Sequence, residues 1–117
     1  MLILENFPLK SLHTFGIEVL ARKFARFNSI ATLKEILESQ SSLPLILGGG
    51  SNILFTKNVD ALVLKNELLG IEKIKEDTDH VWIRAGAGEN WHQFVMHCIT
   101  NNWAGLENLS LIPGCVG

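Results

Sequence analysis

The sequence predicts an α+β fold, in which a strand–helix–strand unit is followed by a second, mixed α/β subdomain. Three patterns support this prediction. Apolar residues recur at helical spacing in residues 30–37, and an apolar run at 45–47 leads into three glycines. Residues 71–75 and 80–85 alternate between apolar and polar side chains, as half-buried strands do.

The first residues are expected to form an extended arm rather than a strand. Residues 6–15 follow no regular apolar pattern and contain Pro8, and Gly16 ends the stretch. Residues 21–27 carry apolar side chains on both faces, with Arg and Lys between them. This second pattern predicts a strand at the margin of a sheet.

A short amphipathic helix is predicted next, ending near Ser39. Its apolar side chains lie on one side, at Ile30, Leu33, Ile36 and Leu37. Either Ser29 or Thr32 is a suitable N-cap, and Thr32 followed by Glu35 has the form of a capping box. With the strand at 45–47, this helix completes a unit that we expect to be parallel and right-handed.

The glycine-rich stretch at residues 48–52 is the strongest candidate for a ligand site. Consecutive glycines can adopt positive φ and allow close approach to the backbone, and successive N–H donors form a concave site suited to phosphate. Apolar residues resume at 53–55, which predicts a further strand directly after the loop. A tight turn without a ligand is the alternative, since glycine clusters mark turns first.

Three more strands and a helix are predicted in the remainder of the chain. Residues 61–64 form a compact apolar strand, and the alternating segments at 71–75 and 80–85 form an antiparallel hairpin. A helix is expected from Asn90, a plausible N-cap, to about Asn101. We expect its Trp91 and Phe94 to be core residues, together with Val95 and Cys98 on the same face.

Composition excludes several classes of protein. With 117 residues, 47% of them apolar, the chain can build one globular domain. A net charge of −2 and scattered Lys and Arg argue against a nucleic-acid-binding surface. The sequence has no basic and apolar leader at its start and no apolar run of membrane-spanning length, which predicts a soluble, cytoplasmic protein. Two cysteines are too few for a disulfide framework.

Alternative chemical motifs are weaker. The glycine loop lacks the Lys of a triphosphate-binding loop, and Trp91 occupies the third glycine position of a Rossmann fingerprint. His92, His97 and Cys98 are poorly spaced for a metal, so we predict no metal site. Glu89 and Glu107 are expected to be solvated or to cap backbone groups rather than to act as paired acids. Cys115 is expected to be a small filler rather than a reactive thiol.

Four segments occur together in an order and spacing that is far more specific than any one of them. They are His13-Thr14-Phe15-Gly16, Leu47-Gly48-Gly49-Gly50-Ser51-Asn52, Gly86-Ala87-Gly88-Glu89-Asn90-Trp91-His92, and the stretch 105–117 with its Pro113-Gly114-Cys115-Val116-Gly117 ending. From about Leu9 onward, the chain closely resembles the bacterial UDP-N-acetylenolpyruvoylglucosamine reductase family. The resemblance implies the N-terminal portion of a vanillyl-alcohol-oxidase-like, non-Rossmann FAD-binding domain.

The resemblance also implies an activity and a set of site residues. Family members reduce UDP-N-acetylenolpyruvoylglucosamine to UDP-N-acetylmuramate with NADPH through FAD, a step of cytoplasmic peptidoglycan synthesis that supports cell shape and division. The serine, glutamate and arginine used in catalysis follow the Pro113–Gly117 motif, so the resemblance assigns no catalytic residue in this chain. His13 stands where the family often has Asn and receives no role. The residues assigned to FAD are Leu47, Gly48, Gly49, Gly50, Ser51, Asn52, Ile53, Ile112, Pro113, Gly114, Cys115 and Gly117.

Further expectations concern the extent of the chain. Its ending in an apolar, glycine-containing motif suggests part of a longer protein, with subdomains at about 1–67 and 68–117. On its own, such a piece is expected to hold FAD weakly, to lack reductase activity and to self-associate through an unpaired sheet edge. Two hypotheses compete with this one: another FAD oxidase or dehydrogenase of the same superfamily, and a stand-alone nucleotide-binding module.

Overall fold

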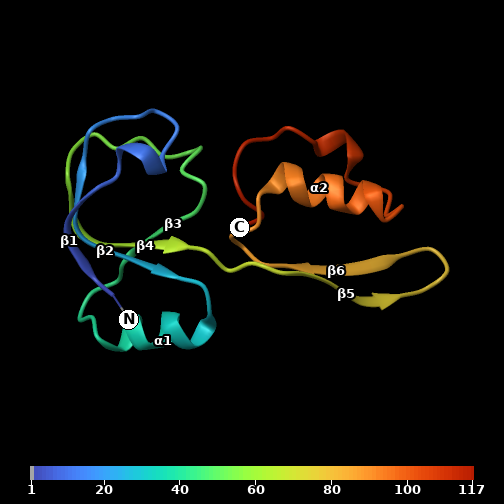
Figure 1. Ribbon diagram of the computed structural model, residues 1–117, viewed down its shortest axis with the longest axis horizontal. Helices are drawn as coiled ribbons and strands as arrows, with labels where there is room; N and C mark the ends of the chain where they lie inside the picture. Colours follow the sequence, from blue (N-terminus) through green and yellow to red (C-terminus); the bar gives the residue numbers. More distant parts are fainter. Residues whose placement is uncertain (1) are drawn as a thin grey trace.

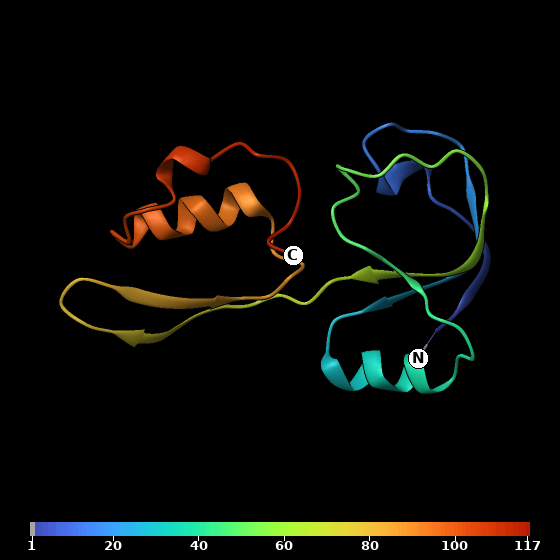
Figure 2. The same ribbon diagram turned by 180° about the vertical axis from the view of Figure 1, so that it is seen from behind.

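The computed structural model describes residues 2–117 as two parts of different construction (Figure 1). At one end lies a four-stranded sheet with helix α1 on one face. At the other end a long hairpin extends away from that sheet, with helix α2 beside it, and the C-terminus lies between the two parts in both views (Figures 1 and 2). The molecule is correspondingly elongated and thin, with extents of 51 × 31 × 17 Å.

The sheet has the strand order β1-β2-β4-β3. Strand β1 (Leu4–Pro8) is antiparallel to β2 (Leu20–Phe27), and β2 is parallel to β4 (Val59–Asn66). Strand β3 (Leu45–Leu47) is also parallel to β4. The predicted strand–helix–strand unit is therefore present with parallel strands, but β4 lies between its two strands and pairs with both.

Strand β1 corrects the expectation of an extended arm without strand structure. The ring of Phe7 stacks on Phe24 of β2, with centroids 4.0 Å apart and planes inclined by 7°. Pro8 is compatible with the strand because it is the last residue of an edge strand, where a missing N–H is tolerated. A 3-10 turn, η1 (Lys10–Leu12), follows within the segment that was expected to be irregular.

Strand β2 is an inner strand, whereas its sequence pattern was interpreted as that of a marginal one. Its two faces enter two separate apolar clusters: Phe24 packs with Leu47 on one side, and Phe27 packs with Ile36 on the other. Apolar side chains on both faces are typical of a strand that is covered on both sides. Between these apolar residues, the side chains of Arg22 and Arg26 remain exposed to solvent.

Helix α1 (Ile30–Glu38) covers one face of the sheet. Ser29 is its N-cap: the Ser29 Oγ accepts the Thr32 N–H at 3.1 Å, so Thr32 lies in the first turn and the suggested Thr32 cap is wrong. Ile36 is fully buried against Leu62 and Leu64 of β4. On the opposite face, a second cluster contains Leu9, Val19, Ala21, Phe24, Leu47, Phe55 and Val63.

The segment after the glycines is a loop, which corrects the strand predicted at 53–55. Residues 48–58 cross from β3 to β4 without regular structure. Phe55 is nevertheless buried, with an exposed fraction of 5%, and its ring meets that of His13 edge-on at 5.0 Å. The apolar run at this position therefore reflects burial of a loop side chain under η1 rather than pairing in a sheet.

The second part confirms the predicted hairpin and helix. Strands β5 (Ile71–Glu76) and β6 (Val81–Ala85) pair antiparallel. Helix α2 (Trp91–Thr100) begins after Asn90, whose Oδ1 accepts the Gln93 N–H at 2.9 Å. It is followed by a 3-10 turn, η2 (Glu107–Leu109).

Helix α2 buries Phe94, Val95 and Cys98. Trp91 is only partly buried, so the expectation that it belongs fully to the core needs correction. Within residues 2–117, none of the helices combines the length and apolar character that crossing a membrane requires.

Backbone hydrogen bonds join the two parts where β4 leads into β5. Glu67 N donates to the Phe27 carbonyl at 2.9 Å, which ties the connection to β2. Gly88 N donates to the Leu68 carbonyl and Gly86 N to the Gly70 carbonyl, both at 2.8 Å. The segment that precedes α2 is thereby held beside the carboxyl end of β4, and this arrangement brings the chain after α2 back towards the glycine loop.

Candidate cofactor site

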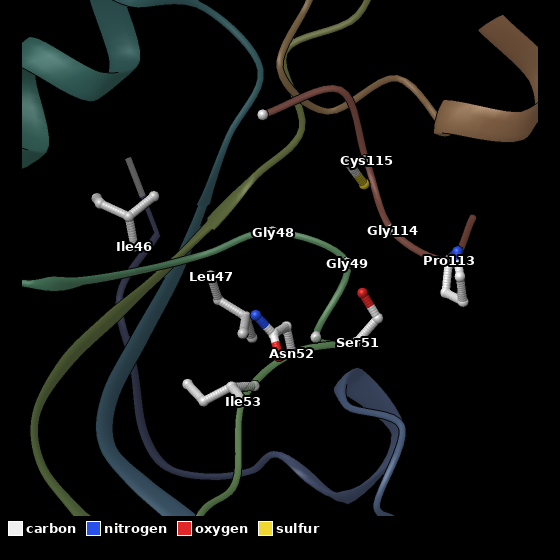
Figure 3. Close-up of a pocket in the computed structure, with 12 residues that line it drawn as sticks. Ile46, Leu47, Gly48, Gly49, Ser51, Asn52, Ile53, Pro113, Gly114 and Cys115 are labelled. Atoms are coloured by element: carbon white, nitrogen blue, oxygen red, sulfur yellow. The ribbon is translucent and has the colours of Figure 1, made fainter. Parts of the chain in front are cut away.

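Two loops far apart in sequence face each other across a cleft of about 370 Å³ (Figure 3). One is the glycine loop after β3, and the other is the final stretch of the chain. Figure 3 shows Gly48 and Gly49 opposite Gly114 and Cys115. The lining residues are Ile46, Leu47, Gly48, Gly49, Gly50, Ser51, Asn52, Ile53, Pro113, Gly114, Cys115 and Gly117.

The cleft brings together all but one of the residues that the sequence pointed to. Ile112 does not line it, and half of its surface is exposed. Ile46, which was not predicted, does line it. The sequence treated Ile46 only as part of a buried strand, and no further signal distinguished it, because the strand is three residues long and its alternation is too short to assign a face.

Gly48 and Gly49 allow the two loops to approach at backbone distance. A Cβ on Gly49 would lie 3.0 Å from the Gly114 Cα, and one on Gly48 would lie 3.1 Å from the Gly117 carbonyl oxygen. Both separations are tighter than ordinary contacts, so a side chain at either position would push the opposite loop away. These two glycines therefore set the width of the cleft.

Gly50 has a different role. Its φ is +70°, and a Cβ there would lie 2.0 Å from the Leu12 carbonyl oxygen and 2.7 Å from the His13 Cα. The Gly50 carbonyl accepts the Thr14 N–H at 2.9 Å. Gly50 is thus required for packing of the glycine loop on Leu12 and His13, and it also lines the cleft.

The glycine loop presents backbone donors without internal partners. Within residues 2–117, the N–H groups of Gly49, Gly50, Ser51 and Asn52 have no hydrogen-bond acceptor. The loop's first carbonyl, that of Gly48, accepts a hydrogen bond from the Lys65 Nζ of β4. Successive free N–H donors in a concave loop suit an anion such as a phosphate group.

The opposite loop is positioned by residues 87–91. Gly114 O accepts the Trp91 N–H at 3.0 Å, Val116 N donates to the Glu89 carbonyl at 2.9 Å, and Gly117 N donates to the Ala87 carbonyl at 3.0 Å. Asn90 and Cys115 form an isolated antiparallel bridge. Backbone hydrogen bonds from residues 87–91 therefore hold the second wall of the cleft in place.

Side chains of α2 support the same wall further back. Trp91 Nε1 donates to the Leu109 carbonyl at 2.7 Å, and the His92 Nδ1 accepts the Leu111 N–H at 3.1 Å. Leu111 itself has a φ of +64°, an uncommon value for a residue with a side chain. The wall is thus held in a mildly strained shape by hydrogen bonds from the helix.

The two glutamates cap backbone N–H groups, as expected. Glu89 Oε1 accepts the Gly70 N–H at 2.8 Å, and Glu107 Oε2 accepts the Gly105 N–H at 2.7 Å. The bond from Gly105 holds the pKa of Glu107 below its ordinary value, because it stabilises the ionised carboxylate. Each carboxylate bonds a separate glycine, so they do not form a pair of catalytic acids with each other.

The remaining candidates behave as structural groups. Burial raises the pKa of the Cys98 thiol, and this side chain lies inside α2's apolar face. Cys115 is half-buried and lines the cleft beside Gly114. Across residues 2–117, no group of three or more His, Cys, Asp and Glu side chains is arranged to hold a metal ion.

His13 lies behind the cleft rather than in it. Its side chain is buried, with 7% exposed, and Nε2 donates to the Ile17 carbonyl at 3.0 Å, because a carbonyl can only accept. The Nδ1 is buried without a partner within the described chain. The sequence had left the role of His13 open, and the structure places it under Gly50.

Comparison with known proteins is consistent with this geometry. Residues 21–117 match the family described as FAD binding domain. The chain is 52% identical to the UDP-N-acetylenolpyruvoylglucosamine reductase of Amoebophilus asiaticus over 97% of its length, and 54% identical to that of Flavobacterium johnsoniae over 100%. It spans only about a third of these curated relatives, 34% and 35% of their lengths.

A solved structure shares the fold. The crystal structure of UDP-N-acetylenolpyruvylglucosamine reductase (MurB) from Thermus caldophilus superimposes with a TM-score of 0.66 at 25% identity. The similarity covers 98% of this chain and 39% of that one. The mixed α/β arrangement described above is therefore found in a protein that carries the name of this reductase.

Proposed function

Because this chain belongs to the FAD-binding domain family, we propose that its cleft binds the diphosphate and flavin portions of FAD. The observation that carries the proposal is the pairing of two glycine-containing loops, one of which offers four backbone N–H donors that have no acceptor in the described part of the chain. The diphosphate is expected on the donors of residues 49–52. Small residues at 114, 115 and 117 would let the cofactor lie against backbone.

The protein that carries this chain is proposed to be a UDP-N-acetylenolpyruvoylglucosamine reductase, as its relatives are named. The chemistry that FAD supplies when bound is hydride transfer from NADPH to the enolpyruvyl double bond of the substrate. Residues of this chain would bind and orient the cofactor and exclude water from one side. No residue of this chain is assigned to proton transfer or to stabilisation of the enol.

The proposed activity carries further consequences. The product, UDP-N-acetylmuramate, is a peptidoglycan precursor, so the protein is proposed to act in cell-wall biogenesis in the cytoplasm and to affect cell shape and division. Residues 1–67 and 68–117 are proposed as two subdomains, the second in part. The chain alone is proposed to hold FAD weakly and to self-associate through exposed strand edges.

Flavin binding tests the proposal directly. Purified protein is titrated with FAD, and binding is followed by flavin fluorescence and visible absorbance. Gly49→Val should weaken FAD binding about 10- to 100-fold, because overpacking of the cleft costs about 1–3 kcal/mol. Thr56→Val, on an exposed residue of the same β3–β4 loop, serves as the control and should bind like wild type.

Activity then separates the candidate functions. Consumption of NADPH that depends on the enolpyruvyl substrate is the expected result for a reductase. FAD binding with no reaction of this substrate, in a protein that includes all the chain found in its relatives, would favour another FAD oxidase or dehydrogenase. Unchanged FAD affinity in Gly49→Val would contradict the placement of the cofactor in this cleft.

A further inference from the structure

Lys65 lies at the carboxyl end of β4, where the glycine loop begins. In the sheet register it is the partner of Leu47, the last residue of β3 before the glycines. Residues of β4 alternate between faces: Leu62 and Leu64 join the cluster under α1, whereas Val63 joins the cluster that contains Leu47 and Phe55. Lys65 is two residues beyond Val63 and therefore points to the face that carries the glycine loop.

The contacts of Lys65 are unusual among the lysines of this chain. Its side chain is half-buried, and the Nζ donates to the Gly48 carbonyl. An ammonium group has three donors, and within residues 2–117 no other acceptor and no carboxylate within ion-pair distance is found for them. Lys10 and Lys73, by contrast, are exposed and paired with Glu18 and Glu76.

Among residues 2–117, none of those that line the cleft is charged. The diphosphate of a dinucleotide carries about two negative charges at neutral pH, so backbone N–H groups alone would leave its charge largely uncompensated. Lys65 is the cation whose hydrogen bond reaches this loop in the described part of the chain. A half-buried ammonium with two unused donors can compensate part of this negative charge, because charge interactions strengthen as water is excluded.

The hydrogen bond also orients the loop. No cis peptide occurs in residues 2–117, and in a trans peptide the C=O and the following N–H point in opposite directions. Because the Gly48 carbonyl points towards Lys65, the Gly49 N–H points away from it and has no internal acceptor. The lysine thus fixes the first free donor of the loop.

We propose that Lys65 is a positioning residue for the bound dinucleotide, which orients the Gly48–Gly49 peptide and adds a positive charge behind the loop that holds the diphosphate. This inference rests on the proposed FAD function of the same cleft. It names a residue that lies outside the two loops and outside the motifs of the sequence. It also implies that the site selects for ligands that carry a diphosphate over ligands that carry only the flavin.

The experiment compares wild type with Lys65→Met, Lys65→Arg and Lys57→Met. Methionine keeps the length and apolar stem without the charge, arginine keeps a charge, and Lys57 is an exposed lysine of the β3–β4 loop that serves as the matched control. Dissociation constants are measured for FAD, ADP and riboflavin at several salt concentrations. Melting temperatures of the free proteins show whether each variant is folded.

Loss of a charge-assisted contact should weaken FAD and ADP binding about tenfold or more in Lys65→Met. Riboflavin binding should stay within about twofold of wild type, and the dependence of FAD affinity on salt should become flatter. Lys65→Arg should recover most of the affinity, and Lys57→Met should match wild type.

Two results would overturn the inference while leaving the proposed function in place. One is FAD affinity in a folded Lys65→Met protein that equals wild type. The other is an equal loss for FAD and riboflavin with an unchanged salt dependence, which would make Lys65 a structural support only. Wild-type protein that binds no FAD would instead remove the proposed function and this inference together.

Discussion

The two walls of the cleft are built by different physical means. The wall formed by the glycine loop is anchored in the core, since Leu47 and Phe55 at its two ends are 2% and 5% exposed. The wall formed by residues 109–117 has an exposed apolar surface, with Leu111 77% exposed, and is held by hydrogen bonds from residues 87–92. The glycine loop should therefore lose its structure only when the sheet unfolds. Residues 109–117, by contrast, can be altered while the sheet stays folded.

The largest effect is expected from Gly50→Ala in the core-anchored wall. A Cβ would collide with the Leu12 carbonyl at 2.0 Å and would also require a positive φ. Together these should lower the free energy of unfolding by about 2–5 kcal/mol, measured by denaturant titration. Gly16→Ala is the matched control, because Gly16 has a φ of +63° with nothing within 4 Å of the Cβ position. A Gly50→Ala protein as stable as Gly16→Ala would show that the clash is relieved cheaply.

A smaller effect is expected from Trp91→Phe in the hydrogen-bonded wall. The change keeps an aromatic ring beside Phe94 but removes the donor to the Leu109 carbonyl. Stability should fall by about 0.5–1.5 kcal/mol, while hydrogen exchange should quicken in residues 109–115 and stay unchanged in β2 and β4. Faster exchange throughout the sheet would mean that the two walls are not independent.

Leu111→Gly should act in the opposite direction. Leu111 has a positive φ of 64° and an exposed side chain, so glycine relieves backbone strain and little packing is lost. We expect a gain of up to about 1 kcal/mol, or no change, in thermal melting. A clear loss of stability would contradict this expectation and show that the Leu111 side chain makes a stabilising contact in solution.

The smallest effect concerns acid stability and Glu107. Its folded pKa lies below the ordinary value because the carboxylate accepts the Gly105 N–H, so its contribution to stability is present above the unfolded pKa and is lost as pH falls through the folded pKa. Glu107→Gln should therefore be slightly less stable than wild type at neutral pH and should approach wild type below the folded pKa, so that its stability depends less on pH on the acid side. Equal acid sensitivity in both proteins would argue against this bond in solution.

The sequence predicted those elements that are determined by residues close to one another along the chain. The cap Asn90, the alternation of the hairpin and the glycines after β3 each act within a few residues and were visible in the sequence, which also offered Ser29 as one of two candidate caps. The position of β2 inside the sheet was not visible, because it depends on β4 entering between β2 and β3. Strand β1 was missed for a related reason: its Pro8 is acceptable only at an edge.

The site was predictable to a similar extent. The glycine loop and most of its opposite wall were found by composition and resemblance, since both are carried by short motifs. Lys65 and Ile46 were not found, because their position depends on strand register across the sheet. The packing of Gly50 against Leu12 was not found, because the two residues are distant in sequence.

The packing of Gly50 on the segment after η1 has a kinetic consequence. The Thr14 N–H holds the Gly50 carbonyl, and the backbone at Leu12 and His13 lies directly against the glycine, so this part of the loop is stiff before any ligand arrives. A ligand that meets a preformed loop loses little affinity to the ordering of flexible backbone. Association should then be a single, concentration-dependent step in stopped-flow measurements, without a slower phase in which the loop rearranges.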